Sequence, residues 1–118
     1  MALHNSFGAD GELLAEAWLK EKGYEILHRN WRHSHYEIDI IAQKGKMLHI
    51  IEVKTRSGTR FGYPEDSVGK KKFKNLQRAA DEFLFLNPGH RWIQFDILSI
   101  TIHKNKEPEY FLVEDVFM

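Results

Sequence analysis

Short apolar runs alternate with polar turns along most of the chain, and this pattern predicts an α/β protein. The runs at 37–42, 47–54 and 92–102 are rich in isoleucine and valine, as buried strands are. A further strand is expected over 24–31, where apolar and polar positions alternate. Residues 110–117 are expected to form a short final strand or tail.

Two longer segments have the apolar spacing of amphipathic helices. The first is expected to follow a cap at Asn5 or Ser6, to reach about Lys22 and to end at the glycine Gly23. The second is expected to follow a cap at residue 66 or 67 and to end near Leu86. The apolar stripe of the first helix is predicted to contain Phe7, Leu14, Ala17 and Trp18, with Leu13 as an alternative member. The resulting order is α-β-β-β-α-β-β, which predicts a mixed sheet flanked by helices.

The two central runs are separated by Gln-Lys-Gly-Lys at 43–46, a suitable hairpin turn because glycine tolerates positive φ. If this turn is centred between positions 45 and 46, Asp39 lies opposite Glu52 and Glu37 lies opposite Lys54. A turn centred one residue earlier slips the register by two and keeps all four residues on one face, whereas an odd-length loop separates them. The even registers bring two carboxylates and an ammonium group together.

Carboxylates on strands that are otherwise apolar need a compensating cation, a partner or water. A hard divalent cation would compensate Asp39 and Glu52, and Mg²⁺ commonly takes one or two protein carboxylates together with waters and phosphates. Lys54, two residues beyond Glu52, would then orient or activate an attacking water or stabilise charge on a phosphate. The alternative is a cross-strand salt bridge on a half-exposed face.

Four short motifs occur in a characteristic order. They are GELLA at 11–15, NWR at 30–32, EIDII at 37–41 and EVKTR at 52–56. Together they resemble the uncharacterised YraN-like family of the PD-(D/E)XK nuclease superfamily, a relative of archaeal Holliday-junction resolvases. The resemblance covers residues 8 to about 98 and implies a restriction-endonuclease-like fold.

This resemblance implies a metal-dependent endonuclease that hydrolyses phosphodiester bonds in structured or branched DNA. Asp39 and Glu52 would hold Mg²⁺ or Mn²⁺, assisted by Glu12 on the first helix and by the Val53 carbonyl. Lys54 would activate the attacking water.

Two positions depart from the family pattern. Tyr36 stands where a glycine usually precedes the first acidic motif. Gln94 replaces the arginine of an Arg-Phe-Asp motif that ends at Asp96, for which we expect a structural or peripheral role.

A length of 118 residues fits a single domain over 1–118, which the resemblance implies is endonuclease-like. The chain has no cysteine, which excludes a disulfide framework and a thiolate zinc site. No apolar run has the length of a membrane span and the N-terminal residues lack a signal-peptide pattern, so we expect a cytoplasmic protein.

Seventeen basic and seventeen acidic residues give no net charge, but their distribution is uneven. Between positions 54 and 78 there are eight Lys/Arg and only two Asp/Glu. Such a basic zone can follow a phosphate backbone, although a solvated helix face is the simpler alternative. The predicted nucleic-acid contacts are Arg56, Arg60, Lys70, Lys74, Gln77 and Arg78.

Two other functional classes stay open. A nucleic-acid-binding module could retain the nuclease fold without cutting, because fold and motif do not establish activity. A protein-interaction domain is suggested by the zero net charge and the aromatic residues Trp31, Trp92 and Phe117. Symmetric cutting of a DNA junction needs two sites, so a two-fold homodimer is one alternative for the assembly.

Overall fold

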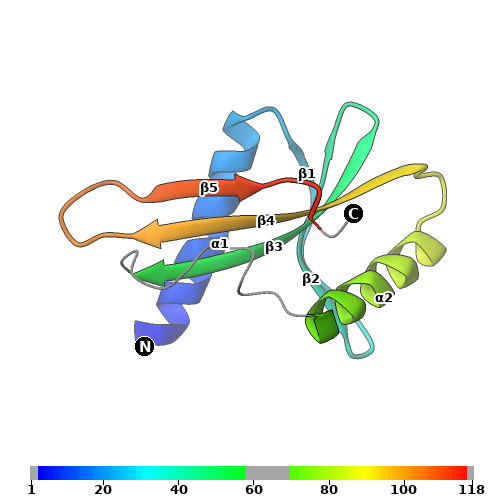
Figure 1. Cartoon of the computed structure of the whole chain (residues 1–118), viewed down its shortest axis with the longest axis horizontal. Helices are drawn as coiled ribbons and strands as arrows, with labels where there is room; N and C mark the ends of the chain where they lie inside the picture. The colour runs from blue at the N-terminus through cyan, green and yellow to red at the C-terminus, as the bar shows by residue number, and fades with distance from the viewer. Residues whose placement is uncertain (1–2, 58–69, 117–118) are drawn as a thin grey trace.

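The computed structural model describes residues 3–57 and 70–116, which form a five-stranded sheet and two helices (Figure 1). The sheet order β1-β2-β3-β4-β5 follows the chain. This arrangement confirms the predicted mixed α/β fold and its order of elements. The elements are α1 (Leu3–Glu21), β1 (Glu25–His33), β2 (Tyr36–Lys44), β3 (Met47–Ser57), α2 (Lys70–Leu86), β4 (Trp92–Ile102) and β5 (Glu109–Val113).

The sheet is mixed because only one of its pairings is parallel. β1, β2 and β3 form an antiparallel meander, and β5 pairs antiparallel with β4. β3 and β4 run parallel from the pair Met47–Trp92 to the pair Ser57–Ile102. A parallel pair requires a crossover connection, and α2 lies in that connection.

Glycines end α1 and form the central turn, as the sequence predicts. Gly23 has φ 95°, and the Tyr24 N–H donates to the Leu19 carbonyl at 3.0 Å. This six-to-one bond, together with the bond from Gly23 to Lys20, is a Schellman cap. Gly45 has φ 62° in the β2–β3 turn. The pair Lys44–Met47 centres that turn between positions 45 and 46, so the first of the predicted registers is the observed one.

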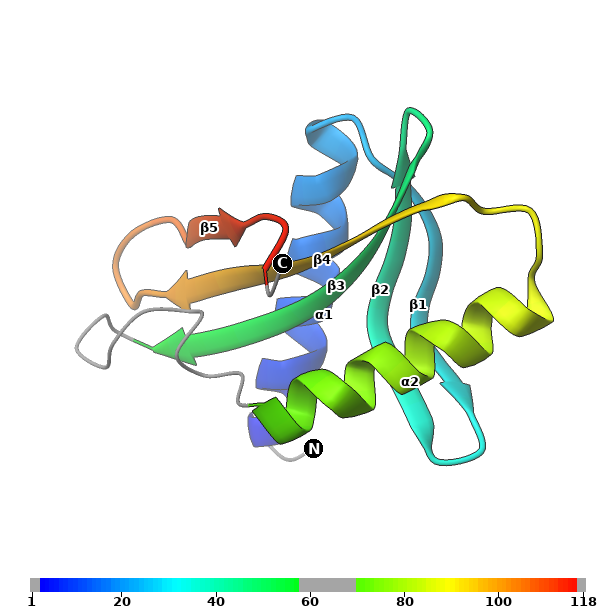
Figure 2. The same cartoon turned by 45° about the vertical axis from the view of Figure 1, so that its right-hand side comes forward.

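The two helices cover opposite faces of the sheet, and each buries a separate apolar cluster (Figure 2). α2 packs over the face that carries Ile38, Ile41 and Ile50, where Phe83 is its largest buried side chain. α1 packs over the face that carries Ile40 and the second half of β4. The buried members on the α1 side are Ala15, Leu19, Tyr24, Ile40, Ala42, Ile51, Leu98 and Ile100.

The buried stripe of α1 differs from the predicted one. Ala15 and Leu19 are completely buried, whereas Ala17 is exposed and Leu13 is 53% exposed. The reason is close packing at Gly11, where an added Cβ would lie only 2.2 Å from the Thr55 hydroxyl oxygen. Contact at this glycine fixes the rotation of the helix. Leu14 and Trp18 are half-buried, as expected, and the side chain of Phe7 lies outside the described part.

Several predicted boundaries are confirmed, the predicted start of α1 is wrong, and one boundary cannot be compared. α1 begins at Leu3, earlier than the predicted cap, while α2 ends at Leu86 and β4 spans the predicted 92–102. The cap predicted at 66 or 67 lies outside the described residues. None of the helices described has the length and apolar character needed to cross a membrane.

Candidate active site

The strands β2 and β3 separate at the position of the predicted acidic pair. Their ladder runs from Lys44–Met47 to Ile40–Ile51, and beyond it β2 continues to pair with β1. At the point of separation the Val53 N–H donates to Asp39 Oδ2 at 2.8 Å. The carboxylate therefore takes the acceptor position that a strand carbonyl would otherwise fill, and it faces Glu52 on the next strand.

Asp39 and Glu52 form a tightly interacting carboxyl pair. Burial, followed by the hydrogen bond and the charge of Glu52, raises the pKa of Asp39 from its ordinary 3.8 to about 7. The Val53 N–H and Lys72 act in the opposite direction. Near neutral pH the Asp39 carboxyl is therefore still protonated in a large share of the molecules, and a bound cation can take the place of that proton. The predicted meeting of these two acids is therefore present in the structure.

Two lysines accompany the acids, one predicted and one not. Lys54 follows on β3, and Lys72 reaches in from α2 to place its Nζ 3.6 Å from Glu52 Oε1. Burial lowers the pKa of the Lys54 ammonium, and the neighbouring Lys72 lowers it further against the opposing charges of Glu52 and Asp39. For Lys72, burial lowers the pKa, but contacts with Lys54, Glu52 and Asp39 outweigh it and give a net rise.

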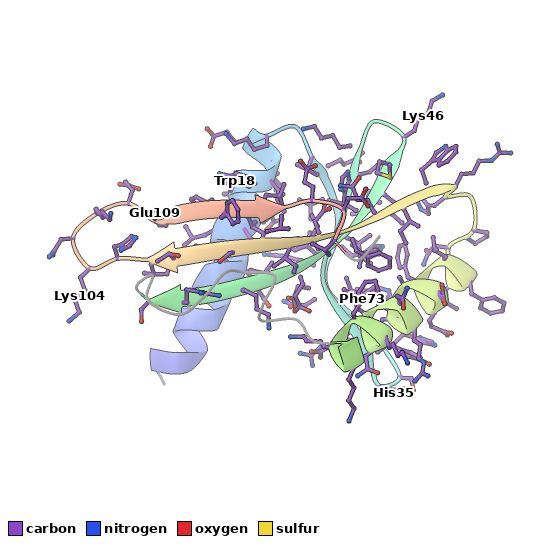
Figure 3. All side chains as sticks on the ribbon, in the orientation of Figure 1. Trp18, His35, Lys46, Phe73, Lys104 and Glu109 are labelled. Atoms are coloured by element: carbon purple, nitrogen blue, oxygen red, sulfur yellow. The ribbon has the colours of Figure 1, made fainter. Side chains whose placement is uncertain are left out.

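The acids open onto a pocket of about 320 Å³ between the β1–β2 turn and α2. Figure 3 shows His35 at that turn, beside the helix. Cationic and acidic groups share the pocket wall, together with one amide, Asn75. The lining residues are His35, Tyr36, Glu37, Asp39, Glu52, Lys72, Asn75, Leu76 and Arg78. The pocket can thus accept a ligand that carries both a cation and an anionic group.

Glu12 and Glu37 have other partners. The Asn30 amide nitrogen donates to Glu12 Oε2 at 2.8 Å, which ties α1 to β1. Glu37 faces Arg32 of β1, with 3.7 Å between Oε2 and Nε, because the β2–β3 ladder has already ended. Within 3–57 and 70–116, no group of three or more His, Cys, Asp or Glu side chains is placed to hold a metal ion. The structure therefore does not assemble Glu12 with Asp39 and Glu52.

The predicted nucleic-acid contacts are spread over α2 and β3. Arg78 lines the acidic pocket and also a second groove, of about 410 Å³, between α2 and β4. Lys74 and Gln77 line this second groove together with apolar side chains such as Phe95. Arg56 lies partly buried on β3. Arg60 and the side chain of Lys70 lie outside the described part of the chain.

The donor set fits a hard divalent cation that keeps open coordination positions. Two adjacent carboxyl groups supply oxygen ligands, and their mutual repulsion favours a cation in place of the shared proton. Mg²⁺ characteristically retains waters or substrate oxygens beside one or two carboxylates, so a complete protein cage is unnecessary. A closed structural metal site does not fit two acids alone.

Sequence reasoning missed Lys72 and Asn75, although the helix contains a signal that identifies Lys72. Lys72 is one of three consecutive lysines, so composition does not distinguish it. It precedes the buried Leu76 by four residues and the buried Ala79 by seven, which places it on the inward side of α2. Lys71 and Lys74 have a different helical phase and do not line the acidic pocket, whereas Lys72 does.

The fold and the site define an α/β protein that carries a carboxyl pair and two lysines where two central strands separate. Comparison with known sequences shows the family to which the chain belongs. Residues 11–100 match the uncharacterised protein family UPF0102, and the chain belongs to that family. The prediction of an uncharacterised family is confirmed at this level.

Similar members of this family come from distant bacteria. A UPF0102 protein of Bacteroides thetaiotaomicron is 48% identical over 100 residues, which cover 85% of this chain and 83% of the relative. One from Flavobacterium psychrophilum is 44% identical, with 97% and 92% covered. One from Rhodococcus jostii is 39% identical and covers 99% of this chain and 100% of its own length. The family likeness therefore extends over nearly the whole chain.

Proposed function

We propose that this protein is a metal-dependent endonuclease of the PD-(D/E)XK superfamily, related to archaeal Holliday-junction resolvases. Its reaction would be hydrolysis of phosphodiester bonds in structured or branched DNA, with Mg²⁺ or Mn²⁺ as cofactor. The observation that carries the proposal is the adjacency of Asp39, Glu52 and the two lysines at the point where β2 leaves β3.

Each residue at this point has a separate role in the proposal. Asp39 and Glu52 would hold the cation, and the Val53 N–H fixes the orientation of Asp39. The Val53 carbonyl would be a further oxygen ligand. Glu12 bonds the Asn30 amide in this structure, so in the proposal it would have to leave that partner to assist the metal site from α1. A bound divalent cation would supply Lewis-acid stabilisation of charge on the phosphate.

Lys54 has the chemistry of a water-activating residue. Its burial and the adjacent Lys72 lower the pKa of its ammonium, which increases the share of neutral amine that can accept a proton. A buried lysine beside a second cationic group is a common means of activating an amine. The proposal assigns Lys54 to take a proton from the attacking water as the new phosphorus–oxygen bond forms. The ester bond to the leaving sugar oxygen breaks, and that oxygen takes a proton from solvent water.

The basic residues of α2 and β3 supply the contacts to DNA in this proposal. Arg56, Arg60, Lys70, Lys74, Gln77 and Arg78 would bind the phosphate backbone, which opposes the repulsion between the acids and a polyanion. Since a junction is cut symmetrically by two sites, a two-fold homodimer belongs to the same proposal.

The first experiment is a cleavage assay on a labelled four-way junction, a flap, single-stranded DNA and plain duplex. Each is incubated with Mn²⁺, Mg²⁺ or chelator, and with the Lys54→Ala variant in parallel. Cutting that requires the metal and Lys54 supports the nuclease, and the ranking of substrates identifies the preferred DNA. Cutting that persists in chelator contradicts the metal-dependent reaction.

The same experiment separates the two alternatives. Salt-sensitive binding without turnover of any substrate favours a DNA-binding module that does not cut. An absence of DNA affinity at low salt, with a defined protein partner bound instead, favours an interaction domain. That second alternative has one observation in its support, since Phe85 is 80% exposed and Trp92 is 60% exposed.

A further inference from the structure

Lys72 occupies a position between the acidic pair and the mouth of the pocket. Its side chain is 44% exposed, whereas that of Glu52 is only 13% exposed. The ammonium therefore reaches from solvent towards a largely buried acid. Lys72 also borders the pocket that Asp39 and Glu52 open onto. A ligand that entered this pocket would meet Lys72 beside the acids.

The ion pair between Lys72 and Glu52 has a long separation. The separation of 3.6 Å lies beyond the usual hydrogen-bond range. A lysine side chain also has a long flexible stem and a strongly hydrated head, so it changes partners at low cost. Because the Lys72 ammonium is half-exposed, water or another anion can replace Glu52 as its partner. The position of Lys72 is therefore better explained if its ammonium can leave Glu52 for a ligand than if the ion pair stabilises the fold.

Two further donors stand beside Lys72 on the same side of α2. Asn75 and Arg78 follow at intervals of three residues, and both line the same pocket. Residues three apart on a helix are neighbours, so the three side chains form a continuous row that rises roughly 9 Å along the axis. The row combines an ammonium, an amide and a guanidinium, all of which donate to phosphate oxygens.

We propose that Lys72, Asn75 and Arg78 form a phosphate-binding row, in which the Lys72 ammonium leaves Glu52 to contact a nucleic-acid phosphate. The inference rests on the proposed nucleic-acid function and adds Lys72 and Asn75 to its contacts. In the DNA-free protein, Lys72 offsets the charge of Glu52. In the complex, the same ammonium places the phosphate next to the acids. Lys72 is thus a binding and positioning residue.

A double-mutant cycle tests this exchange without any cleavage step. The proteins are the unmodified chain, Glu52→Gln, Lys72→Met and the double variant, with Lys71→Met as the matched control. Lys71 is exposed on the same helix and belongs to neither pocket wall described above. Binding of a fluorescein-labelled four-way junction is followed by anisotropy in EDTA, between about 50 and 200 mM salt. Circular dichroism establishes that every variant is folded.

We expect coupling between positions 52 and 72. Glu52→Gln releases Lys72, so it should tighten binding several-fold when Lys72 is present and clearly less in the Lys72→Met background. Lys72→Met should weaken binding roughly tenfold in the Glu52→Gln background, because a charge-assisted contact is lost. It should also reduce the slope of log affinity against log salt by about 0.9, the value for one phosphate. Lys71→Met should show no coupling to Glu52→Gln.

Two results would overturn the exchange. One is an equal gain in junction affinity from Glu52→Gln with Lys72 present and with Lys72→Met. The other is a loss of junction affinity from Lys71→Met as large as that from Lys72→Met. Cleavage of the junction by the unmodified chain in Mn²⁺, together with zero coupling, would remove this inference and leave the nuclease standing. An unmodified chain that neither binds nor cuts DNA would overturn both.

Discussion

The sheet has two clusters built around a carboxyl group, one at Asp96 and one at the Asp39–Glu52 pair, and their hydrogen-bond partners differ. Asp96 on β4 is completely buried and accepts from the Gln94 amide at 2.8 Å and the Asp115 N–H at 2.9 Å. Its other oxygen lies 2.6 Å from His49 Nδ1. Asp39 accepts one backbone N–H and otherwise faces a second acid beside an open pocket. The first cluster is satisfied by the protein, whereas the second is suited to a ligand.

The comparison shows how burial of charge can serve two purposes. A buried carboxylate with several donors links the elements that supply them, and Asp96 joins β3, β4 and the segment after β5. A buried carboxylate that faces another acid is costly in the free protein and gains from a bound cation. Asp96 therefore matches its expected structural role, while the Asp39 pair has the character of a functional site.

The largest expected effect is the loss of cleavage at the Asp39 pair. Asp39→Ala or Glu52→Ala should lower metal-dependent cleavage by at least roughly 10²–10³-fold, as removal of an electrostatic stabiliser does. The measurement is initial cleavage rate at saturating Mn²⁺. Asp39→Asn, which keeps an acceptor for the Val53 N–H, should be equally inactive.

The control for these variants is Glu107→Ala, an exposed acid in the β4–β5 connection. It should cut at the unmodified rate. Full metal-dependent cleavage by either Asp39→Ala or Glu52→Ala would show that the acidic pair is not the catalytic centre.

The second-largest expected effect is a loss of stability when Asp96 is replaced. Asp96→Ala leaves His49, Gln94 and the Asp115 N–H without their acceptor, so it should lower the free energy of unfolding by about 3–5 kcal/mol. Urea denaturation followed by circular dichroism measures this change. A loss below about 1 kcal/mol, comparable with an ordinary surface substitution, would mean that the cluster is not structural.

The third effect is a pH dependence of stability that originates at Asp39. The native carboxyl retains its proton up to about pH 7, whereas the unfolded chain releases it near 3.8. The native state therefore binds more protons in between, and stability should fall as pH rises from about 4 to about 7, then level off. The decline should be on the order of 4 kcal/mol in EDTA and should be much smaller in Asp39→Asn.

Urea unfolding at several pH values, for the unmodified chain and Asp39→Asn, measures this slope. Added Mn²⁺ should raise the melting temperature more at about pH 8 than at about pH 5, because a cation binds the ionised carboxylates. Identical pH profiles for the two proteins would show that Asp39 titrates like an ordinary surface acid.

The smallest effect tests one donor of the satisfied cluster. Gln94→Met removes the amide that donates to Asp96 Oδ1 but leaves the His49 and Asp115 contacts in place. The expected loss of unfolding free energy is about 1–2 kcal/mol, with cleavage by the folded protein retained. A change as large as that of Asp96→Ala would indicate that Gln94 carries the whole network.

Much of the fold follows from local sequence patterns. The alternation of apolar residues and the glycines at 23 and 45 identified the hairpin and the end of α1, and they left a small set of β2–β3 registers, of which the structure has the first. The opposition of Asp39 and Glu52 follows from that register, since residues on adjacent strands are positioned by the turn between them. The rotation of α1 was not predictable, because contact between Gly11 and Thr55 decides it.

The sequence by itself determined the order of elements, the central hairpin and the pair of acids, because these depend on residues close together in the chain. Only the tertiary structure decided where β2 leaves β3, that Lys72 joins the site and that Glu12 bonds Asn30 instead. Those contacts join residues between 14 and 33 positions apart or arise from helix packing on the sheet. Their geometry depends on how whole elements pack. The helical phase of Lys72 indicates which side of α2 it occupies, but not which strand residues lie opposite that side.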